Sequence, residues 1–192
     1  MTDILTIGFA YLLGSFPSAY LFSIFSKRVD IRKAGSGNVG GINAYRVAGF
    51  LPGFITILCD TGKGALAIIL ASALSGELWV IFICGLLVVL GHNYSLFLKF
   101  KGGKGLATTL GVFIVLSPLS ILYVILAALI LAVILRDINT AFGSAALSIP
   151  LVLYLRYLQW DWALFGLALA AIIVIKHIPD YKAYKQGRRK LK

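Results

Sequence analysis

Long apolar runs recur along the whole chain of 192 residues, and they constrain its fold more than any other feature. A helix that crosses the ~30 Å hydrocarbon core of a bilayer needs about 20 mostly apolar residues. Hydrophobic residues make up 60% of the chain and charged residues 13%, whereas soluble domains are about half apolar and a quarter charged. The sequence therefore predicts an all-α integral membrane protein, a single polytopic membrane domain over residues 1–192. We expect spans at about 4–26, 52–74, 78–98, 105–117, 119–135, 141–158 and 162–178.

The segment 105–135 is ambiguous, because it can form one long helix or two short helices separated at Ser117-Pro118. Lysine and arginine concentrate on the cytoplasmic side of membrane proteins, and this bias decides between the two. With a turn at Pro118, three basic groups fall on one side, at 27–46, 99–104 and 176–192. The opposite side then keeps Asp3, Glu77, Asp161 and Arg156. We therefore predict seven transmembrane helices, with the amino end outside, the carboxyl end inside and a basic cytoplasmic tail over 179–192.

Further features exclude several classes of protein. Met1, Thr2 and Asp3 lead directly into the first apolar run, without the basic region that begins a cleaved signal peptide. Cys59 and Cys84 lie inside apolar runs and offer neither a disulfide framework nor metal-ligand spacing. With two histidines in the chain, we expect no metal site and no cofactor. The net charge of +11 is typical of basic flanks that attract anionic membrane lipids. We expect no nucleic-acid partner, because no soluble domain is present to form a groove.

Glycine and basic residues gather in two segments on the predicted cytoplasmic side, GSGNVGGINAYR at 35–46 and KFKGGKG at 99–105. The first contains G-x-G-x-x-G, but a membrane span precedes it where a dinucleotide site needs a strand, and the second is not a Walker loop. Both segments expose backbone N–H groups beside cationic side chains, which suits a phosphate. A flexible connector is the alternative for the first. Ordinary basic flanking is the alternative for the second, and it leaves Gly102, Gly103 and Gly105 unexplained.

Four ionisable residues lie inside apolar runs or at their ends. Asp60 and Lys63, at i and i+3, share one helix face. Because each costs ~3 kcal/mol when it faces lipid, they pair with each other or face a polar cavity. The alternative to a binding site is a structural ion pair. His92 and His177 lie near the ends of the third and seventh spans, where a lone histidine is often an interfacial hydrogen-bonding group. Both histidines fall on the same side as the two glycine-rich segments.

These segments together resemble the bacterial acyl-phosphate:glycerol-3-phosphate acyltransferases of the PlsY type. SGNVGGINAYR, DTGKG, GH with FKGGKGLAT, and a histidine after the last span occur in family order over nearly the full chain. The chain departs from the family at Asn93, in a variable slot, and at Asp180, where an asparagine is expected. The resemblance implies a multi-pass protein of the bacterial inner membrane with its site facing the cytoplasm. It also implies acyl transfer from acyl phosphate to the 1-hydroxyl of sn-glycerol 3-phosphate, which gives lysophosphatidic acid and phosphate in the first step of phospholipid synthesis.

The candidate site combines the residue chemistry with this resemblance. The catalytic residues we predict are Lys104, Ser36, Arg46 and His177, the last by analogy with the family. The substrate- or phosphate-binding residues we predict are Gly37, Asn38, Gly40, Asn43, Lys101, Gly102, Gly103, Thr108, Asp60, Lys63 and His92. Both substrates carry phosphate, so the site needs several cations and N–H groups at the membrane surface. The segment 101–104 would hold a phosphate where the acyl chain enters lipid.

The chain contains neither the H-x-x-x-x-D pair of other acyltransferases nor a G-x-S-x-G nucleophile. An acyl phosphate is already activated, so we expect direct attack by the glycerol hydroxyl, aided by positioning and charge stabilisation. The alternative function is a phosphate or organic-anion transporter, but such proteins have internal repeats and midplane sites. A regulatory membrane scaffold would not explain the two glycine-rich segments. As partners we expect small-molecule substrates and membrane lipids, and we expect the protein to work as a monomer.

Overall fold

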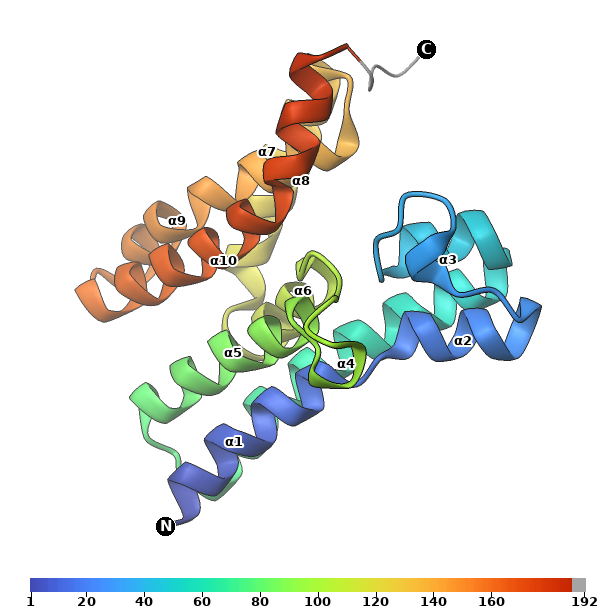
Figure 1. Cartoon of the computed structure of the whole chain (residues 1–192). Helices are drawn as coiled ribbons and strands as arrows, with labels where there is room; N and C mark the ends of the chain where they lie inside the picture. Colours follow the sequence, from blue (N-terminus) through green and yellow to red (C-terminus); the bar gives the residue numbers. More distant parts are fainter. Residues whose placement is uncertain (188–192) are drawn as a thin grey trace. The chain divides into compact units, whose positions relative to one another are not determined.

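The computed structural model describes residues 1–187, and the regular structure in them is helical. The chain divides into two compact units, Met1–Leu116 and Ser117–Lys192, and each is described by itself (Figure 1). Residues 188–192, which belong to the predicted tail over 179–192, lie outside the described residues.

The first unit contains six α-helices and two 3-10 turns. In chain order these are α1 Thr2–Ser15, α2 Ser18–Lys27, η1 Ile31–Lys33, α3 Gly41–Ala48, α4 Phe50–Leu74, α5 Leu78–Asn93, η2 Leu96–Leu98 and α6 Leu106–Leu116. The short α3 packs against α2 and α4, away from the free end of α1 (Figure 1).

The first span is broken where Phe16 precedes Pro17. Proline has no N–H to donate and its ring clashes with the preceding turn, so α1 ends at Ser15 and α2 begins at Ser18. The break leaves the Phe16 carbonyl without an intrahelical donor, and inside a membrane such a group needs a partner from the protein. Two groups supply it: the Ser18 N–H donates at 3.1 Å, and the Nζ of Lys63 from α4 lies 3.2 Å from the Phe16 oxygen.

Glycines bring two pairs of helices in the first unit into close contact. A Cβ on Gly14 or Gly91 would collide with backbone across the interface between α1 and α5. A Cβ on Gly64 would collide with the carbonyl of Thr108, and one on Gly111 would collide with backbone of α4. Small residues drive helix association in membranes by this means, because lipid removes the hydrophobic driving force. The α4–α6 contact fixes the helix that follows the second glycine-rich segment.

The second unit contains four α-helices and one 3-10 turn among its described residues: α7 Pro118–Leu135, α8 Ile138–Ala145, η3 Ala146–Ser148, α9 Ile149–Tyr157 and α10 Trp160–Lys185. Pro118 occupies the first turn of α7, where its missing N–H costs nothing. Asp137 caps α8 by accepting a hydrogen bond of 2.9 Å from the Thr140 N–H.

Six helices of the described residues are long and apolar enough to cross a membrane: Thr2–Lys27 (α1 and α2 together), Phe50–Leu74, Leu78–Leu98, Pro118–Leu135, Ile138–Tyr157 and Trp160–Lys185. The predicted break at Pro118 is confirmed, because α6 ends at Leu116 and α7 begins at Pro118. The fourth predicted span, 105–117, is not among these six; it corresponds to α6, which has 11 residues and is therefore about 16 Å long. The last helix continues to Lys185, so residues 179–185 of the predicted tail are helical.

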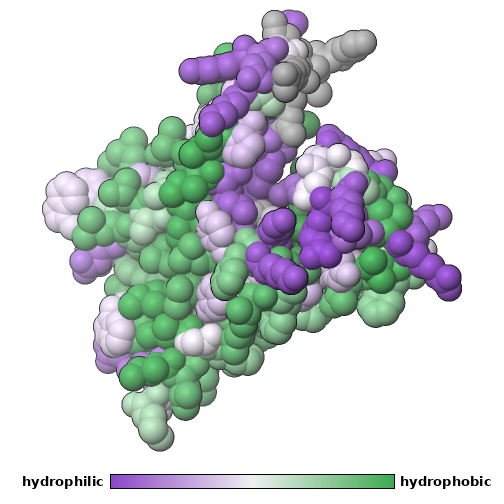
Figure 2. All heavy atoms as spheres, viewed as in Figure 1, coloured by the Kyte–Doolittle hydropathy of each residue, from purple (hydrophilic) through white to green (hydrophobic). Residues whose placement is uncertain are grey.

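Hydrophobic side chains cover the outer surface of these helices, as expected of a chain that faces lipid. Figure 2 shows hydrophobic residues over most of the visible helical surface of the first unit, while hydrophilic residues gather around η1 and α3. The polar end of the first unit is thus the end that carries the first glycine-rich segment.

Candidate active site

The first glycine-rich segment is held in shape by the side chain of Asn43. This residue of α3 is 1% exposed, and its Oδ1 accepts a 2.9 Å hydrogen bond from the Ser36 N–H. Its Nδ2 donates to the carbonyls of Ala34 at 3.1 Å and Asn38 at 3.0 Å. Gly35 has a positive φ of 60° and no room for a Cβ beside Asn43. The amide of Asn43 is therefore engaged within the loop, and this supports a role in holding the loop in shape. Its contact with substrate stays a prediction.

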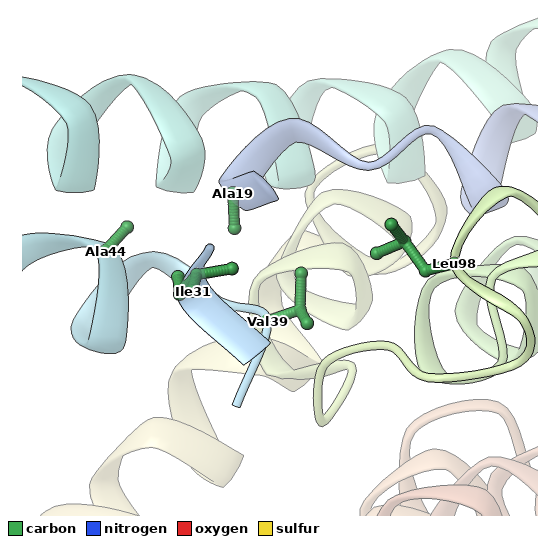
Figure 3. Close-up of a cluster of buried hydrophobic side chains, with 5 residues drawn as sticks. All are labelled: Ala19, Ile31, Val39, Ala44 and Leu98. Atoms are coloured by element: carbon green, nitrogen blue, oxygen red, sulfur yellow. The ribbon is translucent and has the colours of Figure 1, made fainter. Parts of the chain in front are cut away.

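A small hydrophobic cluster joins the two glycine-rich segments (Figure 3). Its buried members are Ala19 of α2, Ile31 of η1, Val39, Ala44 of α3 and Leu98 of η2. Leu98 comes immediately before the KFKGGKG segment, Ile31 precedes the first segment, and Val39 lies within it. The cluster therefore brings together two loops that are far apart in the sequence.

The second glycine-rich segment packs against the carboxyl end of α5. The N–H of Gly103 donates a 3.0 Å hydrogen bond to the carbonyl of His92. A Cβ on Gly102 would collide with the His92 carbonyl, and one on Gly103 would collide with the His92 ring. Gly105 has a positive φ of 86° and lies beside the side chain of Asn93. These contacts explain the three glycines by close packing, and they engage the Gly103 N–H that the sequence suggested for phosphate.

A cavity of about 310 Å³ lies where the two segments meet. Its lining residues are Arg32, Lys33, Gly37, Val39, Lys101 and Gly102. Three of the predicted binding residues, Gly37, Lys101 and Gly102, thus share one cavity. Arg32 and Lys33 were not singled out from the sequence, because they belong to a basic group that topology alone accounts for. Three cationic side chains around a cavity of this size suit a phosphate-bearing ligand.

Arg32 is fixed in place by Asp30. Its Nε and Nη2 donate to the two carboxylate oxygens at 2.9 and 2.8 Å. The Asp30 carboxylate also accepts a 3.0 Å hydrogen bond from the Arg32 N–H, and the guanidinium lies 4.9 Å from the ring centroid of Tyr20. Hydrogen bonding to Arg32 lowers the pKa of Asp30 to about 2. The ion pair is therefore intact at neutral pH, and it orders one cation of the cavity wall.

The predicted catalytic residues of the first unit differ in exposure. Ser36 and Arg46 are exposed, Arg46 in the last turn of α3, and the Arg46 guanidinium makes no hydrogen bond or ion pair with any described residue. Lys104 is partly buried and lies just before α6. Thr108, in the first turn of α6, is fully buried, and its hydroxyl has no hydrogen-bond partner among the described residues. Contacts of these residues with substrate stay predictions.

Three further predicted binding residues of this unit, Asp60, Lys63 and His92, form a buried polar cluster. One carboxylate oxygen of Asp60 lies 2.6 Å from the Ser18 hydroxyl, 2.9 Å from Lys63 Nζ and 3.4 Å from His92 Nδ1. Asp60 is 1% and His92 7% exposed. The ion pair that the sequence left as an alternative to a binding site is therefore present. A phosphate contact by these three residues stays a prediction, and the geometry supports a structural or positioning part.

His177 belongs to the second unit and is fully buried in α10. Its Nδ1 lies 2.8 Å from the carbonyl oxygen of Ile173, one turn earlier in the helix. Gly143 of α8 makes room for the ring, because a Cβ there would lie 2.7 Å from His177 Cγ. Asp180, the departure from the family pattern, is buried in the next turn of α10.

Comparison with known proteins supports the resemblance that the motifs suggested. A family model described as glycerol-3-phosphate acyltransferase matches residues 4–187. A glycerol-3-phosphate acyltransferase of Carboxydothermus hydrogenoformans is 42% identical over 178 residues, which cover 93% of this chain and 90% of the relative. Glycerol-3-phosphate acyltransferase 2 of Moorella thermoacetica is 36% identical over 184 residues, 96% of this chain and 94% of the relative.

Solved structures give the same result. The crystal structure of PlsY, an integral membrane glycerol 3-phosphate acyltransferase, in its glycerol 3-phosphate form matches with a TM-score of 0.90 and 33% identity, over 98% of this chain and 94% of that chain. Its lysophosphatidic acid form matches with a TM-score of 0.85 and 32% identity, with the same coverage. The predicted resemblance is confirmed.

Proposed function

The chain belongs to the glycerol-3-phosphate acyltransferase family, and on this premise we propose that it acylates the 1-hydroxyl of sn-glycerol 3-phosphate with acyl phosphate as donor. The products are lysophosphatidic acid and inorganic phosphate, and the reaction begins phospholipid synthesis. The observation that carries the proposal is the cavity between the two glycine-rich segments, which Arg32, Lys33 and Lys101 line. Both substrates bear phosphate, so a cation-lined cavity suits them.

The reaction needs no covalent intermediate with the protein. The 1-hydroxyl oxygen attacks the acyl carbonyl carbon, the bond between that carbon and the phosphate oxygen breaks, and inorganic phosphate leaves. The hydroxyl proton passes to a phosphate oxygen of the donor. Lys104 stabilises the negative charge that builds on the carbonyl oxygen and then on the phosphate, and this selective stabilisation of the transition state accelerates the step. Ser36 and Arg46 hold glycerol 3-phosphate, with the phosphate bound by the arginine fork. A part for His177 in the reaction stays a prediction that rests on the family resemblance.

The two ends of the acyl donor occupy different surroundings, the phosphate in the cavity and the acyl chain beside the apolar helices. The predicted phosphate ligands Lys101 and Gly102 line the cavity, while the outer surfaces of α4 and α7 are exposed and hydrophobic. A long acyl chain is stable in lipid and its phosphate is not, so the donor binds at the membrane surface. No soluble carrier surface is needed for this arrangement.

The topology that we propose has seven spans in one polytopic domain of a bacterial inner membrane, with the short α6 as the fourth crossing. The amino end is then outside, and both glycine-rich segments and the carboxyl end are inside. The charge distribution supports it, because three basic groups share the cytoplasmic side. The enzyme works as a monomer, with the active site open to the cytoplasm, where glycerol 3-phosphate is supplied.

The experiment that tests the function uses the purified protein in detergent with a long-chain acyl phosphate. We expect phosphate release that depends on glycerol 3-phosphate, with lysophosphatidic acid formed in equal amount. Replacing acyl phosphate by acyl-CoA tests the donor. Phosphate release without glycerol 3-phosphate dependence, or activity with acyl-CoA alone, would contradict the proposal. Uptake of phosphate by sealed vesicles containing the inactive protein would instead favour a transporter.

A further inference from the structure

The buried polar cluster around Asp60 joins four elements of the first unit. Asp60 of α4 accepts from Ser18, which begins α2, and lies within contact of His92 in the last turn of α5. Lys63 of α4 pairs with Asp60 at 2.9 Å and also donates to Phe16 between α1 and α2. A buried ion pair is seldom a source of stability by itself, because desolvation offsets its attraction. Stability alone therefore does not explain why this ion pair lies at the junction of these helices.

The His92 ring connects this cluster to the second glycine-rich segment. Its Nδ1 faces Asp60, at 3.4 Å. Its other side faces Gly103, since a Cβ on Gly103 would collide with His92 Nε2 and Cε1. The carbonyl oxygen of Val39, from the first segment, lies 2.7 Å from the position that this Cβ would occupy. Gly103 is thus enclosed by the His92 ring, the His92 carbonyl and the Val39 carbonyl.

We propose that Asp60 and His92 form a positioning pair for Lys104. Asp60 fixes the orientation of the His92 ring, the ring fixes Gly103, and Gly103 sets the place of the residue that follows it. The inference rests on the proposed function, because it assigns to the pair the task of holding Lys104 beside the reacting phosphate. His92 itself touches no substrate in this arrangement. Catalytic groups require such support, since displacement of one by about 1 Å costs on the order of 100-fold in rate.

Two substitutions of His92 separate its contact with Asp60 from its contact with Gly103. In His92→Asn the amide reaches the place of Nδ1 beside Asp60 but is too short to touch Gly103. In His92→Gln the amide reaches the place of Nε2 and keeps the contact with the loop. We therefore expect His92→Asn to lower kcat by roughly 10- to 100-fold. His92→Gln should retain several times more activity than His92→Asn.

A double-mutant cycle with Lys104→Ala tests whether His92 acts through Lys104. If it does, His92→Asn has little further effect once Lys104 is gone, because there is nothing left to position. A merely structural role would lower activity by the same factor in both backgrounds. The rates are normalised to folded protein, measured by thermal unfolding in detergent, and kcat and KM for glycerol 3-phosphate are determined separately.

Val80→Ala provides the matched control. Val80 is fully buried on the same helix, about 18 Å along it from His92, so its effect should be independent of Lys104. Equal factors for His92→Asn in the two backgrounds, or full activity of His92→Asn, would overturn the inference. A His92→Gln enzyme less active than His92→Asn would also overturn the inference. This second comparison tests the positioning role even where the Lys104→Ala rate is too low to measure. A wild-type protein without acyltransferase activity would instead contradict the proposed function.

Discussion

Two lysines of the second glycine-rich segment differ in their surroundings although both suit a basic flank. Lys99 is exposed, and its backbone is in the left-handed region at φ 54° after η2. Lys104 is partly buried, next to the packed glycines and the start of α6. The losses typical of a missing transition-state donor are about 10²–10³ in turnover. We expect Lys104→Ala to lower kcat by this factor and Lys99→Ala to change it little, as measured by phosphate release.

The comparison between the two variants carries the prediction. Both remove one positive charge from the same loop, so both affect membrane topology signals and the long-range attraction of phosphate equally. If the two enzymes lost activity to the same extent, Lys104 would be a topology signal and the catalytic assignment would be wrong.

Arg46 is exposed in the last turn of α3, and its guanidinium engages no described residue and is therefore available for a ligand. A planar guanidinium binds phosphate through two parallel hydrogen bonds, which an ammonium group does not reproduce. Hydrogen bonds to charged groups contribute about 1.5–3 kcal/mol, so we expect Arg46→Lys to raise KM for glycerol 3-phosphate about tenfold or more. Steady-state kinetics with varied glycerol 3-phosphate would measure this.

Arg28→Lys is the control for that variant, because Arg28 is also exposed and belongs to the same basic group. It should leave KM unchanged. An Arg46→Lys enzyme whose kinetics matched those of Arg28→Lys would remove Arg46 from the site.

At the scale of the elements, the sequence predicted the break at Pro118 but not the break at Pro17. The first break could be predicted because the charge bias required a turn there. The second lies inside an apolar run with the length of a single span. Proline interrupts the helix in both places for the same reason. The difference is that membrane helices tolerate proline when another residue satisfies the freed carbonyl. Here the Phe16 carbonyl accepts from Lys63 and from the Ser18 N–H, and a sequence alone does not show which side chain reaches which carbonyl.

The glycines of α4 give a prediction about helix packing. Gly64 meets the backbone of α6, whereas Gly62, on the same helix, is exposed with no neighbour near its Cβ position. A methyl group at 64 forces α6 away, and overpacking of this kind costs about 1–3 kcal/mol. We expect Gly64→Ala to lower the thermal unfolding temperature in detergent and to lower activity, because α6 follows Lys104.

Gly62→Ala should be neutral or slightly stabilising, since alanine favours a helix over glycine by roughly 0.5–1 kcal/mol. Equal unfolding temperatures for the two variants would show that α4 and α6 are not in close contact through Gly64.

At the scale of the whole molecule, composition and charge predicted a helical membrane protein, and the motifs predicted its family. They did not predict the reason for the glycines of the second segment. Exposed N–H groups were the expected cause, but Gly103 donates to His92 and all three glycines fit against α5. Asn43 likewise faces into its own loop. Whether a polar group faces a ligand or its own backbone depends on contacts between distant segments, such as the cluster of Leu98 with Ile31.

The number of crossings is the prediction that belongs to the whole chain, and it depends on α6. Among the described residues six helices are long enough to span. The helix α6 has 11 residues and, at about 16 Å, covers roughly half of a ~30 Å hydrocarbon core by itself. If α6 crosses, with local thinning of the bilayer or with the preceding segment at membrane depth, seven crossings place both ends of the chain on opposite sides. If it does not cross, Lys192 lies on the same side as Gly76.

We expect a reporter fused after Lys192 to be cytoplasmic and one inserted at Gly76 to be exported, because the three basic groups then share the cytoplasmic side. Paired reporters that are active only in the cytoplasm or only outside it measure this directly, and two fusions reporting the same side would refute the seven-span arrangement.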